Sequence, residues 1–208
     1  MTRSQGHRRR ALGALLLAAL AVGCKPSAPK PFNPDGLAAP KMQPPLAKPD
    51  FTLTTTDGKP FNFRKQTDGK VTLLFFGYTH CPDVCPVHLT NIAAALKKLS
   101  PEVNNAITVV FVTTDPVRDT PAVIRSWLDH FDPRFIGLTG DSTALIAAIS
   151  QLPFGKPTIE RIPGDTGYFV GHPATVLAYT RDNLAHVVYP FGIRQQDWAR
   201  DLPLLVSQ

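Results

Sequence analysis

One stretch decides the fold of this chain: Val71-Thr-Leu-Leu-Phe-Phe-Gly-Tyr-Thr-His-Cys81-Pro-Asp-Val-Cys85-Pro86. Val71 to Phe76 is a continuous apolar run, which is typical of a central strand buried on both faces. A proline inside a helix clashes with the carbonyl group four residues back, so we expect the next helix to begin at Pro86. The stretch therefore predicts a buried strand, a loop that carries two cysteines, and then a helix.

Strands and helices alternate on both sides of this stretch. Asp57-Gly58 is a strong turn signal and predicts a hairpin between residues 51–56 and 61–63. Downstream we expect strands at 107–112 and 135–138, helices at 89–99, 121–131, 142–152 and 195–205, and a closing hairpin of 169–179 with 185–189. Thr120 and Asp141 are the expected N-caps of the second and third helices. Such alternation is typical of a parallel-cored sheet covered on both faces.

The order and length of these elements fit an α/β protein with a thioredoxin-like fold. We expect a central mixed sheet with helices on both faces and an extra N-terminal hairpin. The length of 208 residues and the hydrophobic content of 43% suit one domain with accessory segments. We expect this domain to span residues 50–208 and to be a monomer.

The first 24 residues are typical of an export signal. Four arginines precede an apolar run from Ala11 to Val22, which is shorter than the roughly 20 residues that span a bilayer. The run closes on Ala21-Val-Gly-Cys24, which resembles the lipobox of bacterial lipoproteins and implies that Cys24 is lipidated. We therefore expect residues 1–23 to be a lipoprotein signal peptide, and the protein to be membrane-anchored at the periplasmic or extracytoplasmic face. Ordinary cleavage nearby, with a free Cys24, is the alternative.

Residues 24–49 follow as a lipidated cysteine and a proline-rich tether. Eight prolines lie between Lys25 and Pro49, and they favour extended geometry. The alternative is that part of this segment packs on the domain as an irregular arm. The signal peptide holds four of the 22 basic residues and none of the 16 acidic ones, so its removal lowers the net charge from +6 to +2. This small charge argues against a nucleic acid as partner.

Cys81 and Cys85 form the one cysteine pair that remains after Cys24. A close pair in an exported protein is disulfide-bonded, redox-active or metal-binding, and a disulfide across so short a loop stabilises little. The adjacent helix N-terminus favours thiolates. Three residues separate the cysteines, whereas thioredoxin-type pairs have two, so both sulfurs can converge on one ion. Zinc and iron–sulfur sites usually need four ligands, whereas two sulfurs and one imidazole suffice for copper.

The imidazole has to come from elsewhere in the chain. His172 precedes Pro173 and an apolar strand, and thioredoxin-like domains carry such a proline, often cis, facing the cysteine motif. We therefore expect His172 to meet Cys81 and Cys85; a turn residue that caps the strand is the alternative. The other candidates are His80, His88, His130 and His186. Of these, we expect His130 at a helix end and His186 in solvent.

Two blocks of the sequence resemble the Sco/SenC family of thioredoxin-like copper chaperones. The first is Phe76-Gly-Tyr-Thr-His-Cys-Pro-Asp-Val-Cys-Pro86, and the second runs from Thr113 through Asp115-Pro-Val-Arg118-Asp119 to Gly140. The likeness covers residues 45–207. It implies copper binding through two cysteines and a histidine, and delivery to the dinuclear copper centre of cytochrome c oxidase, with an oxidase subunit as the copper-receiving partner.

The resemblance also implies a second candidate function, thiol–disulfide reductase activity toward the partner, with Cys81 and Cys85 as the redox pair. A peroxide-handling protein is a third and weaker reading. The family usually has Asp-His-Ser where this chain has Gly171-His172-Pro173, so a carboxylate near the third ligand is missing. Asp115, Arg118 and Asp119 are expected at the same sheet edge, either as a docking or electrostatic surface or as a local ion-pair cluster.

Overall fold

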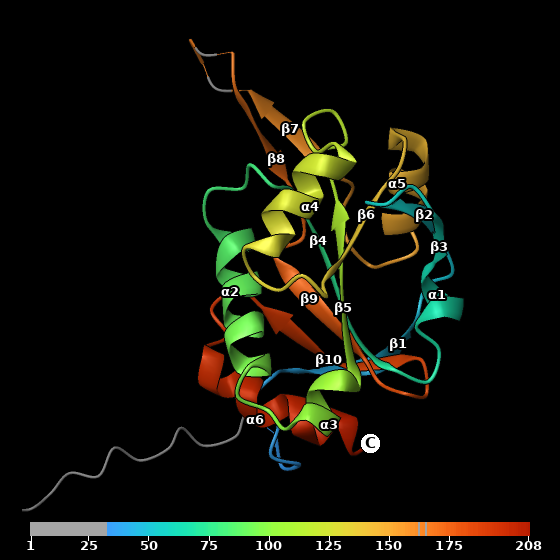
Figure 1. Ribbon diagram of the computed structural model, residues 1–208, viewed down its shortest axis with the longest axis vertical. Helices are drawn as coiled ribbons and strands as arrows, with labels where there is room; N and C mark the ends of the chain where they lie inside the picture. The colour runs from blue at the N-terminus through green and yellow to red at the C-terminus, as the bar shows by residue number, and fades with distance from the viewer. Residues whose placement is uncertain (1–32, 162, 165) are drawn as a thin grey trace, which may run out of the picture.

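The computed structural model describes residues 33–161, 163–164 and 166–208 (Figure 1). The strands are β1 Lys41–Ala47, β2 Thr52–Thr55, β3 Pro60–Asn62, β4 Val71–Gly77, β5 Ile107–Thr113, β6 Ile136–Thr139, β7 Thr158–Arg161, β8 Tyr168–Gly171, β9 Thr175–Tyr179 and β10 Leu184–Pro190. The helices are α1 Phe63–Gln66, α2 Val84–Leu96, α3 Pro101–Asn105, α4 Pro121–Asp129, α5 Ser142–Ile149 and α6 Gln195–Val206. The predicted signal peptide and Cys24 lie outside the described residues.

An eight-stranded mixed sheet forms the centre of the molecule. Its order is β1-β10-β9-β4-β5-β6-β2-β3, with β4, β5 and β6 parallel and the other pairs antiparallel. The β2–β3 pair is the predicted N-terminal hairpin at one edge. This arrangement confirms the predicted fold class.

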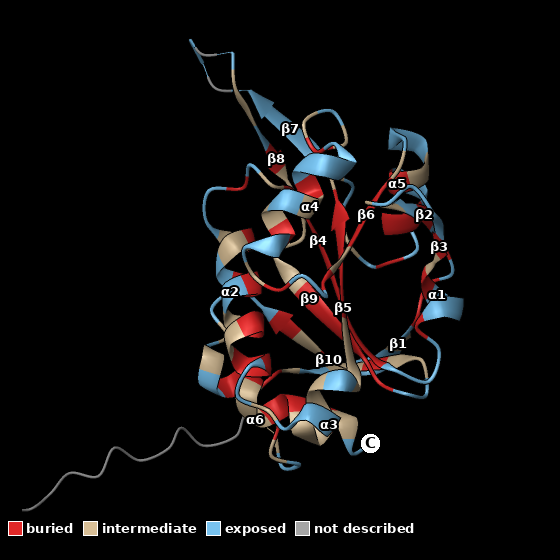
Figure 2. Ribbon diagram, in the orientation of Figure 1, coloured by how far each residue is buried: buried red, intermediate tan, exposed pale blue. Residues whose placement is uncertain are grey.

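Each face of the sheet carries its own hydrophobic core, because alternate side chains of a strand point to opposite faces. Leu73 and Phe75 of β4 pack with α2, α4 and α6, whereas Leu74 and Phe76 pack with α1 and α5. Every residue of β4 is buried. Figure 2 shows the central strands buried between the helices, while β7 is exposed.

The folded part begins earlier than predicted, because the predicted tether of residues 24–49 contains β1. This strand pairs antiparallel with β10, with a register irregularity between Lys41 and Leu46. Pro44 and Pro45 lack the backbone N–H that a ladder needs, so β1 is accommodated as an edge strand. Ahead of it, Leu37 and Ala39 are buried, and Asp201 of α6 accepts hydrogen bonds from the amides of residues 38 and 39.

Two boundaries near the cysteines and the predicted third ligand also differ from the prediction. Helix α2 begins at Val84 rather than Pro86, because a proline in the first turn loses no intrahelical hydrogen bond. The predicted strand 169–179 is divided into β8 and β9, and residues 172–174 lie between them. β8 pairs with β7 in a separate two-stranded sheet, which projects from the body at the top of Figure 1.

Thr120 and Asp141 cap α4 and α5 as predicted, since their side chains accept hydrogen bonds from Val123 and Ala144. Over the described part of the chain, none of the helices combines the length and the apolar character needed to cross a membrane.

Candidate metal centre

Three strands bring their ends together where the cysteine loop leaves the sheet. Phe75 of β4 lies beside Phe111 of the parallel strand β5 and beside Val176 near the start of the antiparallel strand β9. The loops that follow β4 and β5 therefore meet the segment that precedes β9 beyond the carboxyl ends of the parallel strands. Ligand sites in such sheets commonly lie there. This topology places His172 next to cysteines that are about ninety positions away in the sequence.

Cys81, Cys85 and His172 form the predicted cluster. Nε2 of His172 lies 3.7 Å from Sγ of Cys81 and 3.4 Å from Sγ of Cys85. The three ligand atoms lie within 4.8 Å of one another. Metal bonds to thiolate and imidazole are about 2.0–2.3 Å long, so two ligands of one ion lie roughly 3.5–4.5 Å apart. The cluster therefore has the spacing of a three-ligand site.

The two thiols differ in position. Cys81 lies on the loop and is 9% exposed, whereas Cys85 lies in the first turn of α2 and is fully buried. The amide of Cys85 donates to Sγ of Cys81 at 3.5 Å, so the N-terminus of α2 faces the Cys81 sulfur. Both cysteines are free thiols. Cys81 and His172 thus lie nearer to solvent than Cys85 does.

The electrostatics of the thiols follow from these positions. Hydrogen bonding to Cys85 and to His172 lowers the pKa of Cys81 to about 3, against the opposing effect of burial. Burial raises the pKa of Cys85 above its ordinary value, and the neighbouring Cys81 adds to this effect. These shifts favour the thiolate on Cys81 and the thiol on Cys85, and a thiolate attracts a soft cation or attacks a disulfide.

Small and aromatic residues shape the space around the ligands. A Cβ at Gly77 would lie 2.6 Å from Sγ of Cys85, so glycine at the end of β4 makes room for that sulfur. The imidazole of His172 lies edge-on to two rings, with centroids 6.1 Å away for Phe75 and 5.5 Å away for Tyr78. These rings restrict the rotation of the imidazole. The His172–Pro173 peptide bond is trans rather than cis.

The remaining histidines have other positions. His130 is the C-cap residue of α4, and His186 of β10 contacts Asp182, with 2.7 Å between Nε2 and Oδ2. His80 is exposed next to the cysteine loop, where its Nδ1 lies 3.1 Å from the hydroxyl of Thr79. Within the described ranges, the metal-ligating cluster contains His172 and none of these.

His88 supports the site without belonging to the cluster, and its sequence position alone did not predict where its ring points. Its Nε2 lies 3.4 Å from the carbonyl oxygen of Ala174, and its ring is buried against Phe75 and Phe191. His88 thus links α2 to the segment that follows His172. The spacing contains a signal for this role, because residues three apart on a helix share a face and His88 lies three positions after Cys85.

Asp115, Arg118 and Asp119 lie at the predicted edge. Asp119 is fully buried and accepts hydrogen bonds from Thr79 and Thr113, while Arg118 pairs with Asp115. The predicted local ion-pair cluster is therefore present, and it is attached to the cysteine loop.

Comparisons with known proteins agree with this geometry. Residues 39–207 match the protein family described as SCO1/SenC. The SCO2-like protein of Rickettsia felis is 34% identical over 123 residues, which is 59% of this chain and 59% of that protein. Protein SenC of Rhodobacter capsulatus is 37% identical over 124 residues, 55% of each chain. The aligned part thus spans less than two thirds of these curated relatives.

Solved structures are similar over a larger share of the chain. The structure of Bradyrhizobium japonicum ScoI with copper bound has a TM-score of 0.66 and 32% sequence identity, and it covers 77% of this chain and 99% of that one.

Proposed function

Because the chain belongs to the SCO1/SenC family, we propose that it is a copper metallochaperone. It binds copper through the thiolates of Cys81 and Cys85 and the imidazole of His172, and it delivers the ion to the dinuclear copper centre of cytochrome c oxidase. Copper is the cargo of this function. A copper-receiving oxidase subunit is the proposed partner.

The observation that carries this proposal is the meeting of three soft or borderline ligand atoms from two distant segments, within 4.8 Å of one another. Two sulfurs and one nitrogen suit copper(I), which accepts few ligands. The similarity to a copper-bound ScoI supports the same ion. Partial exposure of Cys81 and His172 also suits transfer, since an incoming ligand can replace one of them first.

A copper titration of the reduced and oxidised protein tests the proposal. We expect the reduced protein to bind one copper(I) per chain in competition with a chromophoric chelator, and the Cys81–Cys85 disulfide form to bind none. His172→Ala should weaken binding more than about tenfold, because removal of a residue that only orients a ligand already costs about 10–100-fold. The matched control is His186→Ala on β10. Unchanged copper affinity in His172→Ala would show that the ligand assignment is wrong.

Delivery is measured separately, with the copper-loaded protein and the metal-free soluble domain of an oxidase subunit. The absorption spectrum of the dinuclear centre should appear in the acceptor while the chaperone loses copper. Copper that stays on the chain in the presence of reduced acceptor would contradict delivery.

A thiol–disulfide reductase is the second candidate, favoured by the low pKa of Cys81. The Cys81 thiolate would attack a partner disulfide and release one partner thiolate. The thiol of Cys85 would lose its proton, attack Cys81 and release the second thiolate, which leaves a Cys81–Cys85 disulfide. Burial of Cys85 slows this second step. Fast turnover that survives in His172→Ala, together with weak copper binding in the wild type, would favour the reductase.

We also propose that residues 1–23 are a signal peptide and that lipidated Cys24 anchors the domain at the extracytoplasmic face of a membrane. The lipobox-like sequence supports this location. Cys24→Ser should abolish incorporation of labelled palmitate and release the protein from the membrane fraction. Membrane association that persists without lipid incorporation would contradict the anchor.

A further inference from the structure

The β7–β8 hairpin that precedes His172 is not part of the main sheet. β8 pairs with β7 in a sheet of two strands, and all residues of β7 are exposed. The main sheet holds the segment after His172, since Thr175 pairs with Pro190 and the amide of Phe191 donates to the carbonyl of Ala174, but its ladder does not extend to β8 on the other side of His172. Side-chain contacts with the body of the protein have to hold β8.

Val170 supplies the apolar part of this attachment, because it is buried in the same core as Phe75 and Tyr78. Apolar contacts are not directional, so burial of Val170 holds β8 near the sheet without setting its orientation. Hydrogen bonds and ring stacking are directional, and both are made by one residue of the loop after β5.

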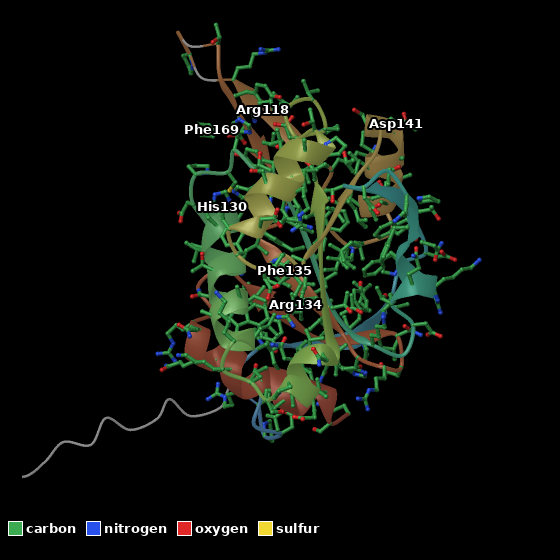
Figure 3. The ribbon with its side chains drawn as sticks, viewed as in Figure 1. Arg118, His130, Arg134, Phe135, Asp141 and Phe169 are labelled. Carbon is green, nitrogen blue, oxygen red and sulfur yellow. The ribbon has the colours of Figure 1, made fainter. Side chains whose placement is uncertain are left out.

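Arg118 connects that loop to β8. Its Nη1 donates a hydrogen bond to the carbonyl oxygen of Tyr168 at 3.0 Å, and its guanidinium carbon lies 3.6 Å from the centroid of the Tyr168 ring. Its Nε donates to Asp115, whose other carboxylate oxygen accepts a hydrogen bond from the Tyr168 hydroxyl at 2.9 Å. Arg118, Asp115 and Tyr168 thus form a closed set of contacts. Figure 3 shows Arg118 at the end of the molecule where the hairpin meets the body, near Phe169 of β8.

The same guanidinium reaches the cysteine loop. Its carbon lies 5.6 Å from the ring centroid of Tyr78, and the Tyr78 ring in turn lies 5.5 Å from the imidazole of His172. The loop that carries Arg118 is attached to the cysteine loop on a second side, because Asp119 accepts hydrogen bonds from the amide and the hydroxyl of Thr79. Arg118 therefore lies between the segment that supplies the sulfurs and the segment that supplies the imidazole.

We propose that Arg118 is a positioning residue, which holds β8 against the cysteine loop and so sets where the imidazole of His172 meets Cys81 and Cys85. It acts through Tyr168 and Tyr78. Arginine suits this position because a planar guanidinium donates hydrogen bonds in its plane while its faces contact aromatic rings, whereas the ammonium of a lysine does not combine the two. The effect of Arg118 on metal binding rests on the proposed copper site, whereas its effect on the position of β8 does not.

The first test is copper(I) affinity of the reduced protein in two backgrounds. Arg118→Gln should lower the affinity about 10- to 100-fold in the wild type, as loss of a ligand-orienting residue does. In the His172→Ala background the same substitution should change the affinity less than about twofold, because the residue that Arg118 positions is gone. Arg118→Lys should behave like Arg118→Gln. Equal losses in both backgrounds, or no loss in the wild type, would overturn the proposal.

The matched control is Arg125→Gln. Arg125 lies on α4, pairs with Asp129 and donates to the carbonyl oxygen of Phe135, so it offers the same kinds of contact away from His172. This variant should bind copper like the wild type. If Arg118→Gln does not fold, Tyr168→Phe tests the same set of contacts, since it removes only the hydrogen bond to Asp115. We expect Tyr168→Phe to lower the affinity about 2- to 10-fold in the wild-type background alone.

The second test needs no copper. Amide hydrogen exchange of the metal-free reduced protein should show faster exchange in residues 168–171 of Arg118→Gln, while β4 exchanges as in the wild type. Unchanged protection of β8 would overturn the proposal. If the wild type does not bind copper, the proposed function fails, and this second measurement still decides whether Arg118 holds β8.

Discussion

At the scale of single residues, Gly77 shows how closely the sheet and the thiols are packed. A Cβ at this position would lie 2.6 Å from Sγ of Cys85 and 3.0 Å from the ring of Phe111. Neither neighbour moves freely, because both are fully buried. The space that a side chain would occupy is therefore already filled by one of the proposed ligands.

We predict that Gly77→Ala displaces Cys85 and weakens copper(I) binding. The overpacking should also cost about 1–3 kcal/mol in the free energy of unfolding. The copper titration and urea unfolding of the reduced protein measure the two effects. Gly155→Ala is the control, since a Cβ there meets no atom within 4 Å. Wild-type copper affinity in Gly77→Ala would mean that the site tolerates a shifted sulfur.

His88 gives the fold a dependence on pH. Burial lowers its pKa below the ordinary value of 6.5, because the charged ring is disfavoured inside the protein. The unfolded chain then binds this proton more readily than the folded chain. The contribution of His88 to stability is therefore complete above pH 6.5 and decreases as the pH falls from there toward the lowered pKa of the folded state.

We predict that His88→Gln reduces the loss of stability on acidification. The glutamine amide can still donate to the carbonyl of Ala174, but it does not titrate. Urea unfolding of the reduced wild type and of His88→Gln, at pH about 7.5 and about 5.5, gives the change in the free energy of unfolding with pH for each protein. The difference between these two changes isolates His88 from the other titrating groups. The exposed His186 provides the control, as His186→Gln. Identical changes for the wild type and His88→Gln would exclude His88 as the cause.

At the scale of elements, the sequence predicted the strands and helices whose pattern is strong and missed those that tertiary contacts define. The apolar run of β4 and the capped helices α4 and α5 are where the pattern placed them. β1 was missed because its prolines mask it. β7 was missed because it is short and buries none of its side chains, and β8 was predicted only as the start of one long strand, 169–179. That Cys81, Cys85 and His172 lie together was predictable because their chemistry restricts the choice. The spacing of His88 from Cys85 indicates a shared helix face but not its contact with Ala174, and the contacts of Arg118 join segments that no sequence spacing relates.

The position of β1 predicts that a chain cut at the expected domain boundary is unstable. Residues 50–208 lack the buried Leu37 and leave Asp201 without its two amide partners. We expect this chain to be about 3–6 kcal/mol less stable to urea than residues 33–208, from the lost burial and from the hydrogen bonds that the buried carboxylate of Asp201 loses. Equal unfolding midpoints would mean that β1 contributes nothing to the fold.

At the scale of the whole molecule, parts of the chain that are far apart in sequence meet beyond the carboxyl ends of the central strands β4 and β5. The cysteine loop follows β4, the loop with Arg118 and Asp119 follows β5, and His172 follows β8. Cys81 lies on the loop between β4 and α2 and Cys85 lies in the first turn of α2, but the histidine follows a hairpin that is held by side chains. A bound ion would thus connect a well-fixed part of the protein to a less well-fixed part.

This arrangement predicts how copper changes the stability of the whole protein. A ligand that binds only the folded state stabilises it by about 2.7 kcal/mol at a free concentration of 100 times Kd. For a domain of this size, that corresponds to a rise in Tm of roughly 5–11 °C. Because the ion joins β8 to the cysteine loop, hydrogen exchange in residues 168–171 should slow more than in β4, which is already buried. Thermal unfolding and exchange of the reduced protein, with and without copper(I), measure both effects. The disulfide form is the control and should not respond. A rise in Tm without added protection in β8 would mean that copper binds the two cysteines while His172 remains outside the site.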